Sequence, residues 1–279
     1  MIPSLFSGVS AMLADQTEID VIGNNIANAN TTAFKSSTAN FTESFMQVSQ
    51  AATANQPVGL EIGLGAEVNT TTTNFSQGVF QTTNVPTDMA INGTGWFEVQ
   101  SGNGDNFLTR NGDFVEDTNG YLRTPDGNYL MGVSGSTPPA SPSSGFAPDK
   151  IQIPTTVTSG SPVVSYTVDA TGTVTVTGQD GTTQVAGYIT VQNYNNNNGL
   201  TDVGNGLYSY QGAAGANQYY QAGSSGTGTI QTGVLEASNV DLSTEFSNMI
   251  IAQNGFDAAA RVITTSNDML QTVTQLKTQ

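Results

Sequence analysis

Three short patterns in this chain have residue types and spacings that are used in protein chemistry. Asp113, Glu116 and Asp117 place carboxylates close together, as in the acid and base pair of a glycoside hydrolase. Residues 117–120, Asp-Thr-Asn-Gly, match the opening of a calcium-binding loop. Residues 93–95, Gly-Thr-Gly, match part of a dinucleotide-binding loop. Each pattern would need further residues to become a working site.

Those further residues are missing from two of the patterns, and the carboxylates have a simpler explanation. The calcium loop lacks the required later Gly and Glu. The glycine pair lacks a third Gly, and residues 96–99 that follow it predict a strand where phosphate binding needs a helix N-terminus. Acidic residues in turns are expected in a chain with a net charge of −16. We therefore predict no catalytic residue, no metal site and no cofactor, and a protein that is not an enzyme.

The composition excludes several other classes of function. The chain has no Cys and no His, so a thiol nucleophile, a zinc site of these residues and a histidine base are excluded. Only six residues are basic, and they are scattered, so we expect no nucleic-acid binding. No stretch approaches the ~18–20 apolar residues of a membrane span, and the first residues lack the pattern of a secretory signal peptide.

Charged residues make up 10% of the chain, against roughly a quarter in an ordinary soluble domain. A neutral polar surface is typical of subunits that approach each other closely in an extracellular assembly. A halotolerant or acid-adapted protein is the alternative interpretation.

Both ends of the chain have apolar residues at seven-residue intervals, which predicts helices packing along other helices. These residues are Leu5, Met12, Ile19 and Ile26 near the N-terminus and Leu242, Met249, Phe256, Ile263 and Leu270 near the C-terminus. We expect helices over residues 4–27, with Ser4 as N-cap, and over about 241–277, with Asp241 or Asn239 as N-cap. The second helix would be roughly 50 Å long.

We interpret these rows as an assembly interface, in which the two helices pair and then pack against copies of themselves. An intramolecular helical hairpin on a globular domain is the simpler alternative. Neither helix would be stable alone in water, because isolated helices need tertiary packing.

The residues between the helices change to the two-residue periodicity of strands. Short alternating segments from about 75 to 133, and again in 151–153, 163–168, 173–177 and 185–194, are separated by turn signals. The turn signals include Asn119-Gly120, Asp126-Gly127, Thr171-Gly172 and Asp180-Gly181. Residues 211–229 are rich in Gly, Ala and Ser and predict a loop.

The expected fold is therefore α+β, with N- and C-terminal helices that pair as a coiled coil and a central all-β domain. Residues 1–34 and 236–279 form the predicted helical domain, and residues 75–235 the β-rich domain. Residues 35–74 are predicted as a connector with an extended segment and a short helix, the helix because Phe41, Phe45 and Met46 have helix-like spacing.

Three runs of sequence resemble a known family. Residues 20–35, DVIGNNIANANTTAFK, resemble the N-terminal signature of bacterial flagellar axial proteins, the rod, hook and hook-associated family. Residues 233–242, GVLEASNVDL, with 249–253, MIIAQ, resemble the matching C-terminal signature. Residues 88–97, DMAINGTGWF, resemble the β-domain motif of the same family.

The resemblance implies a structural subunit of the flagellum whose terminal helices line a tube inside the β domains. Subunits of this family stack helically on copies of themselves, with contacts that do not close into a ring. The implied partners are adjacent rod, hook and hook-associated proteins and the flagellar export and cap proteins. The implied export route is the flagellar type III pathway, without a cleaved signal and without membrane insertion.

The motif residues that we single out are Asn24, Asn25, Asn28, Phe34, Ser238 and Asn239. Amide side chains of this kind hydrogen-bond to backbone where a helix ends or begins, and they also suit contacts between subunits. Both roles remain open at this point.

The chain length suits either a short hook protein or the distal rod protein. The hook, a bendable universal joint between rod and filament, is our preferred prediction, because residues 22–28 and 263–266 look hook-like. The rod, a stiff drive shaft, is the alternative. A secreted β-rich adhesin or polysaccharide hydrolase with helical ends is the alternative of another class.

Overall fold

The computed structural model describes residues 2–44, 46–50, 60–135, 148–210, 214–215, 218–224 and 226–277. The chain forms two compact units. Residues 1–29, 35–74 and 240–279 make up the first, which we call the helical unit. Residues 30–34 and 75–239 make up the second, which we call the β unit.

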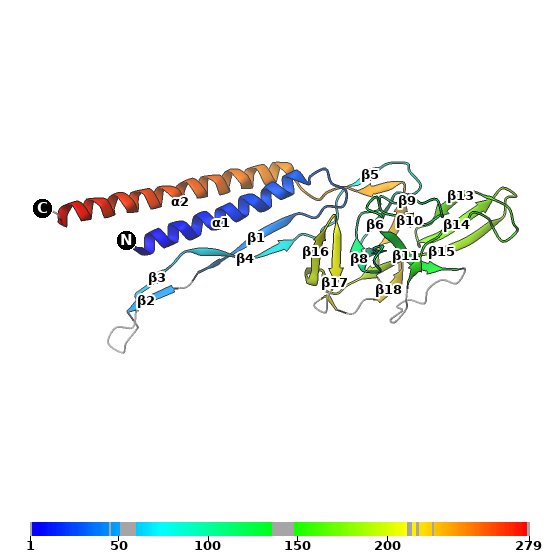
Figure 1. Ribbon diagram of the computed structural model, residues 1–279, viewed down its shortest axis with the longest axis horizontal. Helices are drawn as coiled ribbons and strands as arrows, with labels where there is room; N and C mark the ends of the chain where they lie inside the picture. Colours follow the sequence, from blue (N-terminus) through cyan, green and yellow to red (C-terminus); the bar gives the residue numbers. More distant parts are fainter. Residues whose placement is uncertain are drawn as a thin grey trace. The chain divides into compact units, whose positions relative to one another are not determined.

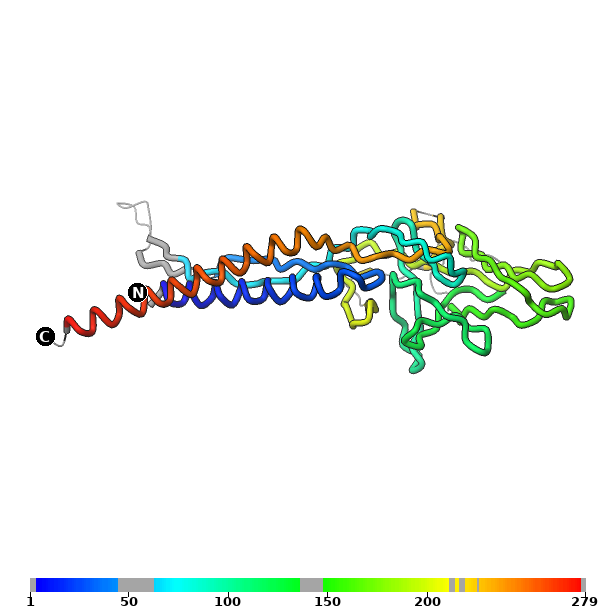
Figure 2. Tube along the Cα trace, turned by 90° about the horizontal axis from the view of Figure 1, so that it is seen from above, coloured from blue at the N-terminus to red at the C-terminus, as the bar shows by residue number. Residues whose placement is uncertain are grey.

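The helical unit is built around the two α-helices of the described residues, α1 (Ile2–Ala27) and α2 (Leu242–Lys277). They lie side by side along most of α1 (Figures 1 and 2). Asp241 caps the start of α2, because its carboxylate accepts hydrogen bonds from Ser243 N at 3.0 Å and Thr244 Oγ1 at 2.9 Å. The predicted pairing of the terminal helices is thus confirmed.

The predicted N-cap at Ser4 is wrong, because α1 begins at Ile2 and Ser4 lies in its first turn. A proline in the first turn of a helix costs no hydrogen bond, so Pro3 did not mark the boundary.

A two-stranded ribbon packs on α1 and occupies the region predicted as a connector. Strand β1 (Ser37–Glu43) pairs antiparallel with β4 (Ala66–Thr73), and β2 (Met46–Gln50) pairs with β3 (Leu60–Gly63). The short helix predicted in this region is wrong, since Phe41 lies in β1 and Met46 in β2, while Phe45 is outside the described residues. Local spacing could not reveal the partner strand about thirty residues later, whose Thr-rich sequence favours pairing.

The β unit contains the strands β5 to β20. They are β5 (Phe80–Thr82), β6 (Met89–Asn92), β7 (Trp96–Gln100), β8 (Asn106–Thr109), β9 (Val115–Glu116), β10 (Leu122–Arg123), β11 (Tyr129–Ser134), β12 (Asp149–Lys150), β13 (Val163–Val168), β14 (Thr173–Gly178), β15 (Thr183–Asn193), β16 (Leu200–Gly204), β17 (Leu207–Tyr210), β18 (Gln218–Gln221), β19 (Thr229–Thr232) and β20 (Val234–Glu236). A short 3₁₀ helix, η1 (Asn197–Gly199), precedes β16.

The largest sheet in the described residues follows the order β13-β14-β15-β11-β7-β8-β17-β16, with β9, β10, β12 and β18 attached to it. Two further pairs, β6 with β19 and β5 with β20, join segments that are far apart in sequence. Strand β18 lies within the segment predicted as a loop and pairs with β15, so that part of the loop prediction is wrong. The central all-β body is confirmed, and with it the α+β fold class.

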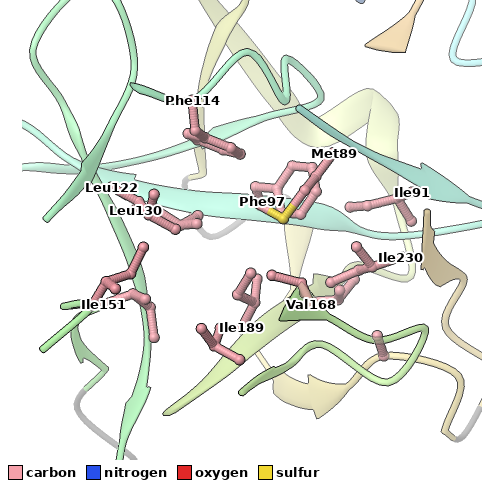
Figure 3. Close-up of a cluster of buried hydrophobic side chains, with 14 of the residues drawn as sticks. Met89, Ile91, Phe97, Phe114, Leu122, Leu130, Ile151, Val168, Ile189 and Ile230 are labelled. Carbon is pink, nitrogen blue, oxygen red and sulfur yellow. The ribbon is translucent and has the colours of Figure 1, made fainter. Parts of the chain in front are cut away.

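Hydrophobic side chains fill both faces of the strand at the centre of the sheet, β7. Phe97 and Val99 point into the main cluster, where Met89, Ile91 and Ile189 also lie (Figure 3). Trp96 points the other way, because successive side chains of a strand alternate between faces. The second cluster consists of Trp96, Leu108, Tyr194, Leu200, Tyr208 and Ala214.

The four predicted turns all have a glycine with positive φ, namely Gly120, Gly127, Gly172 and Gly181. Gly120 also approaches the segment after β12 closely, since a Cβ atom there would lie 2.2 Å from Ile153 O. A side chain at this position would therefore be excluded by space as well as by backbone conformation.

Candidate functional site

One face of α2 forms a row in which small and large side chains alternate. Its buried members are Glu245, Ala252, Ala259 and Ser266, and its half-buried members are Met249, Phe256, Ile263 and Leu270. The intervals alternate between three and four residues, which is the spacing of a coiled-coil seam. We call this row the α2 seam.

Small and polar residues of α1 face the α2 seam. A Cβ atom on Gly8 would lie 2.9 Å from Cγ1 of Ile263, so the two helices approach closely there. The Ser4 and Ser266 hydroxyl oxygens are 3.2 Å apart. The predicted residues of α1 lie beside this face and are half-buried: Leu5, Met12, Ile19 and Ile26.

Of the predicted interface residues of α2, Ile263 lies against α1, and Met249, Phe256 and Leu270 share its spacing and are half-buried, while Leu242 differs. Leu242 is 42% exposed, since it precedes the part of α2 that faces α1 closely. A role of these residues in contacts between copies stays a prediction.

Other apolar residues of both helices are exposed to solvent. On α1 they include Phe6, at 62% exposure, and Leu13. On α2 they include Ile251, at 68%, Met269 and Leu276. Spacing places Ile251, Met269 and Leu276 along one side of α2, away from the α2 seam. Sequence reasoning missed these residues, although they form a second apolar row beside the seven-residue pattern.

Asn25 joins the end of α1 to the ribbon and to α2. Its side chain is 1% exposed. The amide nitrogen donates to Ser37 O at 2.8 Å and to Glu245 Oε1 at 3.2 Å, while the amide oxygen accepts from Ser37 N at 3.0 Å. This two-way bond with one backbone residue fixes the orientation of the amide, and it is a reason for Asn at this position.

Asn28 closes the last turn of α1. Its amide nitrogen donates to Asn24 O and to Asn24 Oδ1, both at 2.9 Å. The backbone nitrogen of Asn28 also donates to Asn24 O, at 3.1 Å, so the side-chain bonds reinforce the last turn of the helix. Asn25 and Asn28 thus hydrogen-bond to backbone at the end of α1, and a role of these amides in contacts between subunits stays a prediction.

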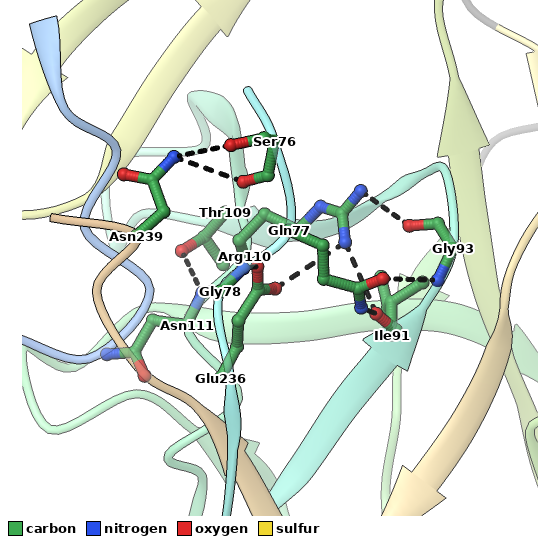
Figure 4. A network of polar contacts seen from close by, with 10 residues as sticks. All are labelled: Ser76, Gln77, Gly78, Ile91, Gly93, Thr109, Arg110, Asn111, Glu236 and Asn239. Carbon is green, nitrogen blue, oxygen red and sulfur yellow. Dashed lines mark hydrogen bonds and ion pairs between the residues drawn. The ribbon is translucent and has the colours of Figure 1, made fainter. Parts of the chain in front are cut away.

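The remaining motif residues lie in the β unit. Asn239 donates from its side chain to Ser76 O at 3.1 Å and Ser76 Oγ at 3.2 Å, and its backbone nitrogen donates to Phe34 O at 3.3 Å (Figure 4). Phe34 and Ser238 are half-buried. Asn239 thus connects neighbouring segments of the β unit, and the N-cap of α2 is Asp241.

Glu236 is a junction that sequence reasoning did not single out. It is completely buried, and its carboxylate accepts from Gly78 N at 2.9 Å and lies 3.5 Å from Arg110 Nη1. Its backbone oxygen accepts from Ala33 N at 2.7 Å. Ala33 has a φ of 56°, in the left-handed region that is strained for a residue other than glycine. The bond to Glu236 helps to hold this conformation.

Arg110 completes the buried network that Figure 4 shows. It donates to Gly93 O at 2.8 Å and Ile91 O at 3.3 Å, and its guanidinium lies 5.4 Å from the centre of the Trp96 ring. Burial lowers the pKa of Arg110, and the negative charge of Glu236 opposes this effect. The pair therefore links β6, β20 and the strand that contains Trp96. The only sequence signal was a lone Arg in a chain with few basic residues.

The three short patterns considered as possible chemical sites fold as turns and strands. Asp117 accepts from Thr118 N at 2.7 Å and forms an ion pair with Arg123 at 3.3 Å, as a turn residue does. Asp113 is half-buried, and burial together with the charge of Asp88 raises its pKa. Residues 93–95 lead into strand β7. Among the described residues no group of acidic side chains has the arrangement of a metal site.

Comparisons with known proteins find family matches in three parts of the chain. Residues 5–35 match the model of the flagella basal body rod protein. Residues 90–176 match the flagellar hook protein FlgE/F/G D1 domain, and residues 231–276 match the flagellar basal body rod FlgEFG protein C-terminal model. The flagellar basal-body rod protein FlgG of Bacillus subtilis is 37% identical over 99% of this chain and 100% of its own length.

The chain belongs to the flagellar hook and basal-body rod protein family.

Two other members of the family show how far the similarity extends. FlgG of Borreliella burgdorferi is 32% identical over the full length of both chains. The flagellar hook protein FlgE of Helicobacter mustelae is 46% identical, but over 47% of this chain and 31% of its own length.

Family membership gives the site its meaning. The protein is a structural subunit of the flagellar axis. The family consists of structural proteins, which agrees with the prediction that the chain is not an enzyme. Neither helix in the described residues is long and apolar enough to cross a membrane.

Proposed function

We propose that the chain polymerises into the rod of the flagellar basal body, as a stiff element of the drive shaft. The observation that supports polymerisation is the exposed apolar surface of the helical unit. α1 and α2 already use the α2 seam to hold each other, yet Phe6, Leu13, Ile251 and Leu276 are still more than half exposed. Apolar area of this kind is stabilised when it is buried, at roughly 25 cal/mol per Å².

The partner of this surface is another copy of the chain in a helical homopolymer. Each exposed row would pack on a row of a neighbouring subunit, in a contact that repeats along the axis. On this proposal the α2 seam stabilises the subunit, and the exposed rows join subunits. The residues at seven-residue spacing would then hold the two helices of one subunit together, and the contacts between subunits would come from the exposed rows beside them.

A pair of matched charge substitutions separates the two roles. Ile251→Asp places a charge on an exposed row, and we expect it to prevent assembly while leaving the helical content unchanged. Phe256→Asp places a charge in the α2 seam, and we expect it to loosen the helix pair as well as prevent assembly. Asn254→Asp adds the same charge at an exposed polar position of α2 and is the control.

Sedimentation and electron microscopy of the purified variants measure assembly, and circular dichroism measures helical content. Polymers of normal yield from the Ile251→Asp variant would show that the exposed row does not join subunits. Loss of assembly in the control would show that added charge alone is responsible.

The choice of rod over hook is supported by the extent of the similarity. The rod relatives match this chain from end to end, whereas the hook relative matches less than half of it. The sequence alone led us to prefer the hook, which remains the second candidate because the local identity to FlgE is high over those 140 residues.

Electron microscopy of flagella from a strain that lacks this gene distinguishes the two. The rod proposal predicts that the distal part of the rod is missing together with the hook and filament. Complete rods without hooks would identify the hook subunit instead, and normal flagella would contradict both.

We further propose that the subunit reaches the flagellum through the flagellar type III pathway, without a cleaved signal, and contacts adjacent rod, hook and cap proteins there. Intact mass measurement of subunits from purified flagella tests the absence of cleavage. A mass that lacks N-terminal residues beyond Met1 would contradict it.

The alternative class, an adhesin or polysaccharide hydrolase, makes a different prediction for deletion of residues 242–279. An axial subunit should lose assembly and leave a soluble β unit, while an adhesin or hydrolase should keep its binding or activity.

A further inference from the structure

Glu98 is a buried carboxyl group of the β unit, outside the site described above. It lies on β7, and its side chain is completely buried. It shares a face with Trp96, two residues earlier, and so belongs beside the second cluster and away from the main core. A carboxylate is almost never buried in this way unless a cation or several donors compensate for the lost hydration.

No basic residue compensates for this carboxyl group. In the part of the chain that the structure describes, the ion pairs of the β unit join Arg110 to Glu236 and Arg123 to Asp117. Lys150 lies over the Tyr129 ring, with Nζ 4.0 Å from the ring centre. The other three basic residues are in the helical unit: Lys35, Arg261 and Lys277.

Hydrogen-bond donors compensate only in part. Tyr219 donates from its hydroxyl group to Glu98 Oε1 at 3.4 Å, which is long for such a bond. Glu98 Oε2 is buried and makes no hydrogen bond of good geometry among the described residues, although Gln192 and Asn106 lie close enough to the carboxylate to favour its charged form. An ionised carboxylate would therefore have a buried oxygen without a well-placed donor, which costs more free energy than a neutral carboxyl group in the same place.

The titratable groups that face Glu98 are tyrosines. They come from β17, β18 and the segment after β15, and are Tyr210, Tyr219 and Tyr194. Burial raises the pKa of Tyr194 and of Tyr210, so both are neutral over the physiological range. The neighbours Gln192 and Asn106 are also neutral, and Arg110, which contacts Trp96, is already paired with Glu236.

We propose that Glu98 is a proton-binding site of the folded β unit, in which burial without a cation stabilises the neutral carboxyl group, and that loss of the proton weakens the fold. Burial raises the pKa of Glu98 from 4.5 to about 7, against the opposing effect of Gln192, Tyr219 and Asn106. The unfolded chain has the ordinary pKa.

The direction of the pH dependence follows from these two values. Between about pH 4.5 and 7 the folded protein binds the proton and the unfolded chain does not, so stability falls as the pH rises through this window. Above it both states are ionised and the dependence ends. For pKa values of 4.5 and 7, the unfolding equilibrium constant rises about 70-fold between pH 5 and pH 8.

The test compares wild type with Glu98→Gln in the full chain. Gln keeps an oxygen that accepts from Tyr219 and replaces Oε2 by a neutral amide, so it resembles the protonated acid. Urea unfolding at pH 5 and pH 8 is followed by the fluorescence of Trp96, which is the single tryptophan of the chain. Between pH 5 and pH 8, we expect the unfolding equilibrium constant of the variant to rise about 70-fold less than that of wild type.

Glu116→Gln is the matched control, since it makes the same change at an exposed position of the β unit. It should unfold with the pH dependence of wild type. Other carboxylates contribute equally to all three proteins and cancel in the comparison. Parallel pH profiles for wild type and Glu98→Gln would overturn the proposal.

A second measurement does not depend on the variant folding. Carbon-13 NMR of the side-chain carboxyl groups in wild type labelled at glutamate should show one resonance that titrates near pH 7. Titration of every glutamate below pH 5.5 would overturn the proposal on its own. Both measurements concern the β unit, so their outcome is independent of the choice between rod and hook.

Discussion

The buried pair of Arg110 and Glu236 should be the most costly polar interaction to break in the β unit. Their side chains are 8% and 0% exposed, and the charged atoms are 3.5 Å apart. At an effective dielectric constant of ~20, two charges at this distance attract by about 5 kcal/mol. Glu236→Gln removes this attraction, while the bonds from Arg110 to two carbonyl groups remain. We expect a loss of about 3 kcal/mol in the free energy of unfolding.

Arg110→Met should cost a similar amount, because it leaves the carboxylate of Glu236 buried without its cation, although the backbone nitrogen of Gly78 still donates to it. The double variant removes both charges together. We expect it to lose about 2 kcal/mol less than the sum of the single variants, since neither charge is then left alone.

Urea unfolding followed by circular dichroism measures these free energies. Fluorescence serves as a second probe, because the guanidinium of Arg110 lies near the Trp96 ring and its removal changes the native signal. Coincident transitions by both probes are needed for a two-state interpretation.

Asp117→Asn is the control, because it breaks the ion pair between Asp117 and Arg123. The Arg123 side chain is 34% exposed and that of Asp117 is 22% exposed. Exposed ion pairs contribute less than about 1 kcal/mol. If the free energies of the buried variants add within about 0.5 kcal/mol, or if Glu236→Gln costs no more than the control, the argument from burial is refuted.

Three further substitutions test the close contacts of both units. Asn25→Ala removes three hydrogen bonds at the end of α1, and thermal unfolding of the helical signal should show a loss of about 2–3 kcal/mol. Gly112→Ala would place Cβ 1.5 Å from a backbone oxygen, so we expect the free energy of unfolding to fall by more than about 4 kcal/mol, or the protein to be insoluble. Gly102 has open space around it, so Gly102→Ala should be tolerated in the same solubility and urea assays. Ala259→Leu overfills the α2 seam and should cost about 1–3 kcal/mol, whereas Ala258→Leu on the exposed side should leave the helical melting curve unchanged.

Much of the fold followed from local patterns in the sequence. Seven-residue spacing located both helices, because only a helix brings such residues to one side. Turn pairs such as Asn119-Gly120 and Asp180-Gly181 located hairpins, since glycine there adopts a positive φ that other residues avoid.

What the sequence could not show was which distant segments become neighbours. Strand β7 pairs with β15, and β6 with β19, across long intervals of chain. The same limit explains the error in β1, where the pairing partner lies about thirty residues later. The burial of Glu98 and of Glu236 depends on this topology, so neither could be recognised as special from its own surroundings in the sequence.

The alternation of large and small residues in the α2 seam has a mechanical consequence for the helix pair. If one helix slid along the other, the smallest step that restored the alternation would be one seven-residue repeat, ~10.5 Å. Even that step would remove Ile263 from its place beside Gly8 and Glu245 from its bond with Asn25. The helix pair therefore has no second stable register close to the observed one. Under load the two helices should bend or twist together before one slides along the other.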